Sequence, residues 1–314
     1  ERLWEELPGR RCVLVAGGGD GEVLLERYIA GSSPEERLEG DSVAKTISAL
    51  LIGVLVAQGR LDLDRPLSSY NVTPQAYWGD GNQYWPMVTA RHLLTHTSGL
   101  GEEPPGQSFV YSSGKHLQHL SLLIEKVTTP PLGRWRSPVE WAEESFARPL
   151  NLTGLFLHDN IGGQISIGGG QRLSCRDLAK VGQLILNWGR WPTSLLNMPG
   201  DEKVGRWNLS WAAVGRGTKF RQLIGEDYLK QMFQPSFPSV VSTYGFLVWL
   251  HRKPGPADSD CCLCTSGVCL GRSGPPLMGD SVKEVAWLAA GYLTKYLMVL
   301  PQRNAFIVSM GMDL

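Results

Sequence analysis

The chain has 314 residues, of which 42% are apolar and 19% charged, a composition that predicts one large folded domain and excludes a disordered chain. Thirty Lys and Arg side chains balance thirty Asp and Glu side chains, so the broad positive field that drives nucleic-acid binding is absent and we expect no nucleic-acid partner. The longest apolar run, residues 47–57, is far shorter than the roughly 20 residues that cross a bilayer, so we expect no transmembrane segment.

The first predicted element is a β-hairpin. Apolar residues dominate 12–16 and 22–28, and the Gly-rich turn between them contains Asp20-Gly21, which suits the positive φ of a tight turn. These glycines do not form a G-x-G-x-x-G phosphate loop, because Glu22 replaces the last glycine and a strand follows. Residues 42–59 then carry apolar side chains at helical spacing and end at Gly59, which predicts a buried helix.

Further helices and strands follow in a simple order. Four more helices are predicted, at residues 89–96, 113–127, 138–146 and 174–188. The last has a clear start, because Ser174 and Asp177 form a capping box. Three strands are predicted, at residues 244–251, 292–300 and 305–310. Residues 254–276 have the composition of an exposed loop. Strands at both chain ends with helices between them predict an α+β fold, in which the terminal strands share one antiparallel sheet flanked by helices.

The strongest local chemical signal is Ser-Val-Ala-Lys at the start of the first predicted helix. Residues three apart share a helix face, so the Lys45 amine can approach the Ser42 hydroxyl beside the positive end of the helix dipole. Burial beside Ile and Leu side chains would lower the pKa of Lys45 and let it accept a proton from a nucleophilic serine. The tetrapeptide alone is a weak motif and is more typical of an N-cap serine followed by an incidental lysine.

Several blocks in order resemble the serine β-lactamase and penicillin-binding-protein-like superfamily, and more narrowly the class C β-lactamase-related hydrolases that include carboxylesterases and the 6-aminohexanoate-dimer hydrolase. The blocks are Ser-Val-Ala-Lys at 42–45, Gly-Arg-Leu-Asp-Leu-Asp-Arg-Pro-Leu at 59–67, Leu-Leu-Thr-His-Thr-Ser-Gly-Leu at 93–100 and Tyr-Ser-Ser-Gly at 111–114. The similarity continues to about Gly311. It implies a β-lactamase/transpeptidase-like fold with a mainly helical insertion. We expect a single catalytic domain over residues 1–314, with an α/β part at about 1–65 and 165–314 and a helical part at about 66–164.

The resemblance also implies roles for individual residues. Ser42 matches the family nucleophile, Lys45 the lysine that activates it, and Tyr111 the tyrosine that shuttles a proton to the leaving group. A phenol held near an ammonium could act as a phenolate, because a nearby positive charge favours ionisation. Without the resemblance, Tyr111 is better interpreted as an ordinary packed aromatic residue whose hydroxyl is hydrogen-bonded.

Two positions depart from the family pattern. Ser113 stands where many members have Asn, so a hydroxyl replaces an amide that would orient the substrate. The Lys-Thr-Gly motif is replaced by Ala-Trp-Leu at 286–288, which leaves Trp287 where a cation would hold the carboxylate of a β-lactam. The strand continues as Ala-Ala-Gly at 289–291, and we expect backbone N–H groups of Ser42 and near Ala289, with Gly291 beside them, to form the oxyanion hole.

These residues predict a serine hydrolase that cleaves a small-molecule ester or amide through an acyl-Ser42 intermediate. It needs no cofactor. His92 and His96, four residues apart, could share a metal, but no third ligand lies near them in sequence and we expect no metal site. Two alternatives stay open: an acyltransferase that uses the same acyl-enzyme, and a catalytically silent lumenal binding or scaffold protein of the same fold.

The cysteines and glycosylation motifs bear on the compartment. Four of the six cysteines crowd one Gly- and Pro-rich segment, at Cys261, Cys262, Cys264 and Cys269. Disulfides, free thiols and a zinc site all fit this cluster; disulfides would join its members to one another, or one of them to Cys12 or Cys175. Together with the N-x-[ST] motifs at Asn71, Asn151 and Asn208, the cluster predicts a secretory-pathway lumen or the extracellular space. A leader would have been removed or lie outside this sequence.

Overall fold

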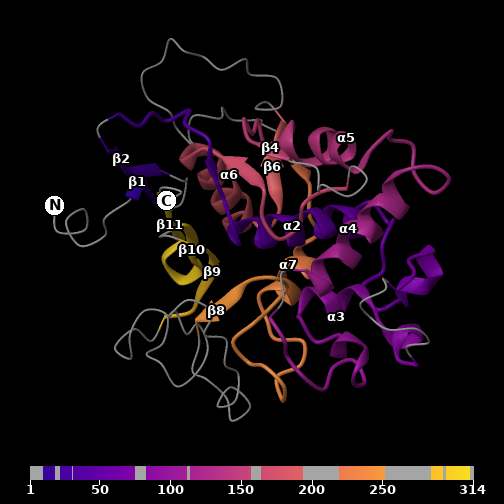
Figure 1. The fold of residues 1–314 in the computed structure, drawn as a ribbon. Helices are drawn as coiled ribbons and strands as arrows, with labels where there is room; N and C mark the ends of the chain where they lie inside the picture. Colours follow the sequence, from indigo (N-terminus) through magenta and orange to yellow (C-terminus); the bar gives the residue numbers. More distant parts are fainter. Residues whose placement is uncertain are drawn as a thin grey trace.

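The computed structural model describes residues 10–17, 22–29, 31–74, 83–111, 114–156, 164–193, 219–251, 284–292 and 295–311. Its central feature is a six-stranded antiparallel sheet with the strand order β2-β1-β11-β10-β9-β8 (Figure 1). The strands are β1 (Arg10–Gly17), β2 (Glu22–Tyr28), β8 (Trp249–His251), β9 (Ala286–Gly291), β10 (Lys295–Leu300) and β11 (Ala305–Gly311). The pairing of β1 with β11 confirms that both ends of the chain share one sheet.

The first predicted helix is the centre of the molecule. Helix α2 (Val43–Ala57) is buried at every residue from Val43 to Leu55, as a helix that is apolar on all sides must be. It lies between the sheet and helix α4 (Lys115–Thr128) (Figure 1). Its C-cap residue, Gln58, is followed by Gly59 with φ +67°, a left-handed conformation that suits glycine and stops the helix.

The remaining predicted helices are present, with shifted ends. They are α3 (Ala90–Leu94), α4, α5 (Pro138–Ala142) and α6 (Cys175–Leu186). Helix α5 runs on into a π-helical turn, η5 (Glu143–Ala147). Helix α6 starts with the predicted capping box, since Ser174 Oγ accepts from the Asp177 N–H and the Asp177 carboxylate accepts from the Ser174 N–H. Helix α7 (Glu226–Met232) is an addition that the sequence analysis did not predict.

Short elements complete the fold. A three-stranded sheet has the order β3-β5-β4, and β6 pairs with β7. Their bounds are β3 (Leu38–Glu39), β4 (Leu155–Phe156), β5 (Gln171–Leu173), β6 (Arg190–Pro192) and β7 (Phe220–Gln222). Four 3₁₀ turns are η1 (Leu67–Tyr70), η3 (Trp85–Met87), η4 (Gly99–Gly101) and η9 (Pro301–Arg303).

Two strand predictions were wrong in their bounds. The predicted strand at 244–251 is reduced to β8, because Leu247 has a positive φ of 50° and the Gly245 N–H bonds Val248 O at 2.9 Å, which makes a turn. The predicted strand at 292–300 starts only at Lys295, since Tyr292 belongs to the turn that follows β9. The strand expected at 286–291 is present as β9, and it brings the residues that replace Lys-Thr-Gly next to α2.

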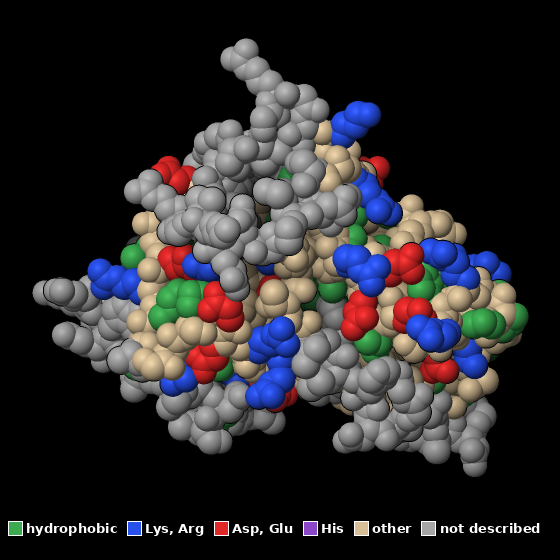
Figure 2. All heavy atoms as spheres, turned by 90° about the horizontal axis from the view of Figure 1, so that it is seen from above, with side chains coloured by type: hydrophobic (Ala, Val, Ile, Leu, Met, Phe, Trp, Pro, Cys, Tyr) green, Lys and Arg blue, Asp and Glu red, His purple; other side chains and the backbone are tan. Residues whose placement is uncertain are grey.

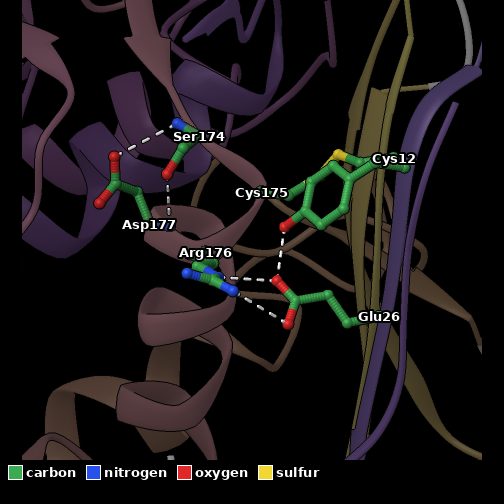
Figure 3. The surroundings of a disulfide bond; sticks show 7 residues. Cys12, Glu26, Ser174, Cys175, Arg176 and Asp177 are labelled. Carbon is green, nitrogen blue, oxygen red and sulfur yellow. Dashed lines mark hydrogen bonds and ion pairs between the residues drawn. A yellow bond between two sulfur atoms is a disulfide. The ribbon is translucent and has the colours of Figure 1, made fainter. Parts of the chain in front are cut away.

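A disulfide ties the sheet to helix α6. Cys12 of β1 is bonded to Cys175, the first residue of α6, 163 positions away, with 6.6 Å between the Cα atoms. Figure 3 shows Glu26 and Arg176 beside this bond; Arg176 Nε donates to Glu26 Oε1 at 2.7 Å. Because Cys12 and Cys175 bond each other, the predicted pairing of one of them with the cluster at 261–269 was wrong. The cluster itself lies outside the described residues.

The surface has no dominant charge on the face shown in Figure 2, where Lys and Arg side chains alternate with Asp and Glu side chains. This mixing accords with the equal numbers of basic and acidic residues. Every helix in the described part of the chain is too short or too polar to cross a membrane.

Candidate active site

Ser42 sits at the first turn of α2 but does not cap it. Its backbone is helical, with φ −68° and ψ −7°, and its side chain makes no capping hydrogen bond to the helix backbone. The Lys45 Nζ lies 2.7 Å from Ser42 Oγ instead. The hydroxyl of a capping serine would accept a hydrogen bond from a backbone N–H of the helix. The geometry therefore favours a nucleophile activated by Lys45 over a helix cap as the role of Ser42.

Lys45 is a buried amine with few polar neighbours. The residue is 1% exposed and its Nζ also contacts Gly168 O at 3.1 Å, in the loop before β5. Burial lowers the pKa of Lys45 to about 8, although the negative charge of Asp41 opposes this shift. At pH 7 roughly one-tenth of such an amine is neutral, so a proton acceptor is available to the Ser42 hydroxyl.

Tyr111 completes the group. It lies between η4 and α4, and the Lys45 Nζ is 5.2 Å from the centre of its ring. Burial raises the pKa of the Tyr111 phenol, and a hydrogen bond from Ser42 works in the opposite direction. Burial therefore favours the neutral phenol over the phenolate that the sequence suggested, and a neutral phenol can donate a proton.

An aromatic cluster holds Tyr111 in place. Its ring stacks against Trp249 of β8 at 5.7 Å and lies 5.1 Å from the ring of His96. His96 is fully buried, and burial lowers its pKa well below the ordinary value, so it is a neutral ring. His92 stacks on Phe237 instead. The two histidines thus have separate surroundings, and within the described ranges no three potential metal ligands come together.

Strand β9 meets the loop that precedes Ser42. A Cβ atom on Gly291 would lie 2.6 Å from Gly40 O and 3.3 Å from Val43 Cγ2, so only glycine allows this approach. Ala289 is 2% exposed in the same strand. Trp287 stacks on Phe233 at 3.8 Å within the main core, whereas its neighbour Leu288 belongs to the cluster that Tyr111 packs against. The structure thus places Gly291 beside the turn before Ser42, whereas Trp287, earlier on the same face of β9, packs against Phe233 in the main core. Ser113 lies outside the described residues.

The sequence analysis missed one pair at this site. Lys295 Nζ donates to Asp41 Oδ2 at 2.7 Å, next to Ser42 in the chain. The sequence contained one signal for this pair, the alternation along the strand. Lys295, Leu297 and Val299 follow one another at every second position, on the buried face of β10. A lysine in a buried row indicates a partner, but the partner is 254 residues away.

Comparison with known proteins defines the class. The sequence pattern described as Beta-lactamase matches residues 1–310, so the chain belongs to the beta-lactamase family. The penicillin binding protein from Bacillus halodurans has a similar structure, with a TM-score of 0.61 at 16% identity over 99% of this chain and 93% of that one. A likeness at this identity speaks for the fold alone, and it confirms the predicted β-lactamase/transpeptidase-like α+β fold.

Two curated relatives are more similar in sequence. Sixty residues, 19% of this chain and 15% of the relative, are 48% identical to esterase EstB of Burkholderia gladioli. A stretch of 204 residues, 54% of this chain and 50% of the relative, is 25% identical to the 6-aminohexanoate-dimer hydrolase of Paenarthrobacter ureafaciens. The chain therefore matches half or less of the length of these relatives.

Proposed function

We propose that this protein is a serine hydrolase that cleaves a small-molecule ester or amide through an acyl-Ser42 intermediate. The observation that carries the proposal is the 2.7 Å contact between Lys45 Nζ and Ser42 Oγ, made by an amine whose pKa is lowered to about 8. The family of the chain, and relatives named as an esterase and an amide-dimer hydrolase, support the same reaction class.

Each residue has a defined step in the proposed reaction. Neutral Lys45 takes the hydroxyl proton as Ser42 Oγ forms a bond to the substrate carbonyl. The carbonyl oxygen becomes an oxyanion, which the backbone N–H groups of Ser42 and near Ala289 would stabilise. Protonated Tyr111 donates to the leaving alcohol or amine as its bond to carbon breaks, and Lys45 returns a proton to Tyr111. Water then gives a proton to neutral Lys45 and adds to the carbonyl of the acyl-Ser42 ester; the bond from carbon to Ser42 Oγ breaks, Lys45 returns the proton to Oγ, and the acid is released.

A fluorophosphonate probe tests the nucleophile directly. Ser42 Oγ displaces fluoride from phosphorus, so the intact mass of the protein rises by one phosphonyl group. We expect one group per chain in the wild type, none in Ser42→Ala, and turnover of p-nitrophenyl esters in the wild type only. Equal labelling of Ser42→Ala would contradict the assignment, provided that its thermal unfolding matches that of the wild type.

The substrate preference follows from the missing cation. Ala286, Trp287 and Leu288 stand where a Lys-Thr-Gly motif would hold a carboxylate, and the lysine close to the site, Lys295, is buried and paired with Asp41. An anionic ligand would lose its hydration without gaining a partner from these described residues. We therefore expect simple esters to have higher kcat/KM than penicillins and cephalosporins, and a β-lactam that exceeds every ester tested would refute this.

Two other functions use the same fold. An acyltransferase would pass the acyl group to a second hydroxyl or amine, and adding such acceptors to the ester assay would raise the yield of the transfer product above that of the acid. A catalytically silent scaffold would fail to react with the probe. The close approach of Lys45, Ser42 and Tyr111 supports an enzyme over a scaffold.

We also propose that the chain matures in the secretory lumen or outside the cell. The Cys12–Cys175 disulfide and the exposed positions of Asn71 and Asn151 support this, while Asn208 lies outside the described residues. Thiol counting and intact mass of protein from its native compartment are the test. Six free thiols, the full number in the sequence, with unmodified asparagines would contradict the proposal.

A further inference from the structure

Lys295 is, like Lys45, a fully buried lysine near the candidate site. Its side chain is 0% exposed, and the two inward positions that follow it on β10, Leu297 and Val299, are each 1% exposed. A charge in such a row is retained only with a partner that neutralises it. The partner is Asp41, whose Oδ2 accepts from Lys295 Nζ at 2.7 Å.

Asp41 is the residue that shapes the entry into α2. Its φ of +45° is left-handed, a conformation that aspartate adopts less readily than glycine. The turn it forms is closed by the Ala44 N–H to Asp41 O at 3.0 Å and the Val43 N–H to Gly40 O at 3.0 Å. Ser42 therefore takes its position from a turn that is anchored at one end by a side chain from β10.

Gly291, the cross-strand neighbour of Lys295, lies against the same turn before Ser42. Gly291 pairs with Lys295 in the register of β9 and β10, and its Cα lies against Gly40 O. The sheet thus touches the Gly40–Asp41 turn twice, once by backbone contact and once by the ion pair. The end of the sheet is therefore in direct contact with the turn that leads into Ser42.

We propose that Lys295 is a positioning residue, whose ammonium holds Asp41 and so fixes the turn that presents Ser42 while balancing the negative charge next to Lys45. The role rests on the proposed function, because it acts on the reactivity of Ser42. It extends the site to a residue on β10 whose ammonium contacts Asp41, the neighbour of Ser42 in the chain.

The charges that face Lys45 define the expected pH effects. Asp41 faces it from the turn, Tyr111 from the segment before α4, and the neutral ring of His96 from the segment after α3. Asp41 raises the pKa of Lys45, and Lys295 reduces this effect by pairing with the carboxylate. Removing Lys295 should raise the pKa of Lys45, whereas removing the charge of Asp41 should lower it.

The test measures the rate of fluorophosphonate labelling of Ser42 against pH in the full chain. In the wild type the rate should rise with pH to a plateau above about pH 8, as Lys45 becomes neutral. In Lys295→Met this rise should move to higher pH by roughly one unit, and in Asp41→Asn to lower pH. Both variants should also have a lower plateau, because the turn is released. Lys230→Met removes an exposed lysine paired with Glu226 on α7 and is the matched control, with no expected change.

Shifts of the labelling profile to higher pH in Lys295→Met and to lower pH in Asp41→Asn distinguish the positioning role from a merely structural one. A merely structural role would lower the plateau of the labelling rate and leave unchanged the pH at which the rate rises. If thermal unfolding shows that Lys295→Met does not fold, Lys295→Gln takes its place, since it removes the charge and keeps a donor. A reactive wild-type Ser42 with the same profile in both variants, or with shifts in one direction, overturns the positioning role alone. An unreactive wild-type Ser42 overturns the proposed function and the positioning role with it.

Discussion

The burial of Lys45 makes its amine a better proton acceptor but destabilises the fold. Its pKa falls from the ordinary 10.5 to about 8 in the folded chain, because burial penalises the charged form. The unfolded chain therefore binds the extra proton between these pH values, so stability should rise with pH through this window. Below pH 8 the folded protein carries the full penalty of a buried ammonium.

We expect Lys45→Met to abolish labelling of Ser42 and to stabilise the fold. Removing the buried ammonium stabilises the fold by about 3 kcal/mol at pH 7, whereas losing its contact with Gly168 O destabilises it by a smaller amount. The free energy of unfolding should therefore increase by about 1–2 kcal/mol. Urea denaturation at pH 7 and pH 10 measures it. The gain should shrink at the higher pH, and a variant less stable than the wild type at pH 7 would contradict the burial argument.

Tyr111 gives a prediction that depends on the leaving group. A protonated phenol helps only a leaving group that needs a proton, so Tyr111→Phe should lower kcat/KM for alkyl esters or amides by about 10²-fold. It should affect p-nitrophenyl esters far less, because p-nitrophenolate leaves without a proton. Rates for a series of esters of one acid measure this difference. An equal loss across the series would mean that Tyr111 acts by packing alone.

How much of the site the sequence predicts depends on the distance between its residues in the chain. Ser42 and Lys45 are one helical turn apart, so their approach follows from helix geometry. Tyr111 needed the resemblance to known hydrolases, because an isolated tyrosine has no distinguishing pattern. The ion pair of Asp41 and Lys295 spans 254 residues, and no local rule relates the two.

At the scale of elements, the helices were more predictable than the strands. The α6 helix was recognised by a capping box, in which Ser174 and Asp177 satisfy each other's backbone, and α2 by its apolar spacing and Gly59. Strand β8 was predicted too long, because nothing in the sequence around Leu247 signals a left-handed residue. Strand ends here are set by tertiary contacts, such as the Leu247 N–H bond to Leu94 O at 2.8 Å.

The meeting of β9 with the turn before α2 can be tested by Gly291→Ala. The added methyl group would lie 2.6 Å from Gly40 O, so the turn or the strand must shift. We expect at least a tenfold slower labelling of Ser42, comparable to about 1.4 kcal/mol. Gly225→Ala is the control, because a Cβ there meets nothing within 4 Å. Equal labelling rates in the wild type and Gly291→Ala would show that the turn tolerates displacement.

At the scale of the whole molecule, the Cys12–Cys175 bond closes the largest covalent loop described. It joins residues 163 apart, and a loop of this size lowers the entropy of the unfolded chain enough to stabilise the fold by about 3–5 kcal/mol. Replacing both cysteines by serine should lower the free energy of unfolding by this amount. Urea denaturation with and without reductant measures it: the reductant should destabilise the wild type by about this amount more than it destabilises the double variant, which keeps the four cysteines at 261–269.

The position of β11 between β1 and β10 has a consequence for the growing polypeptide. A ribosome that has reached Leu300 has already made Ser42, Lys45, Tyr111 and Lys295. The hairpin of β1 and β2 and the strands β8 to β10 still have no common neighbour, and each presents an unpaired edge. The sheet joins into one only when the last seven-residue strand, Ala305–Gly311, is inserted between them. Until then the nascent chain is most exposed to aggregation and most dependent on chaperones.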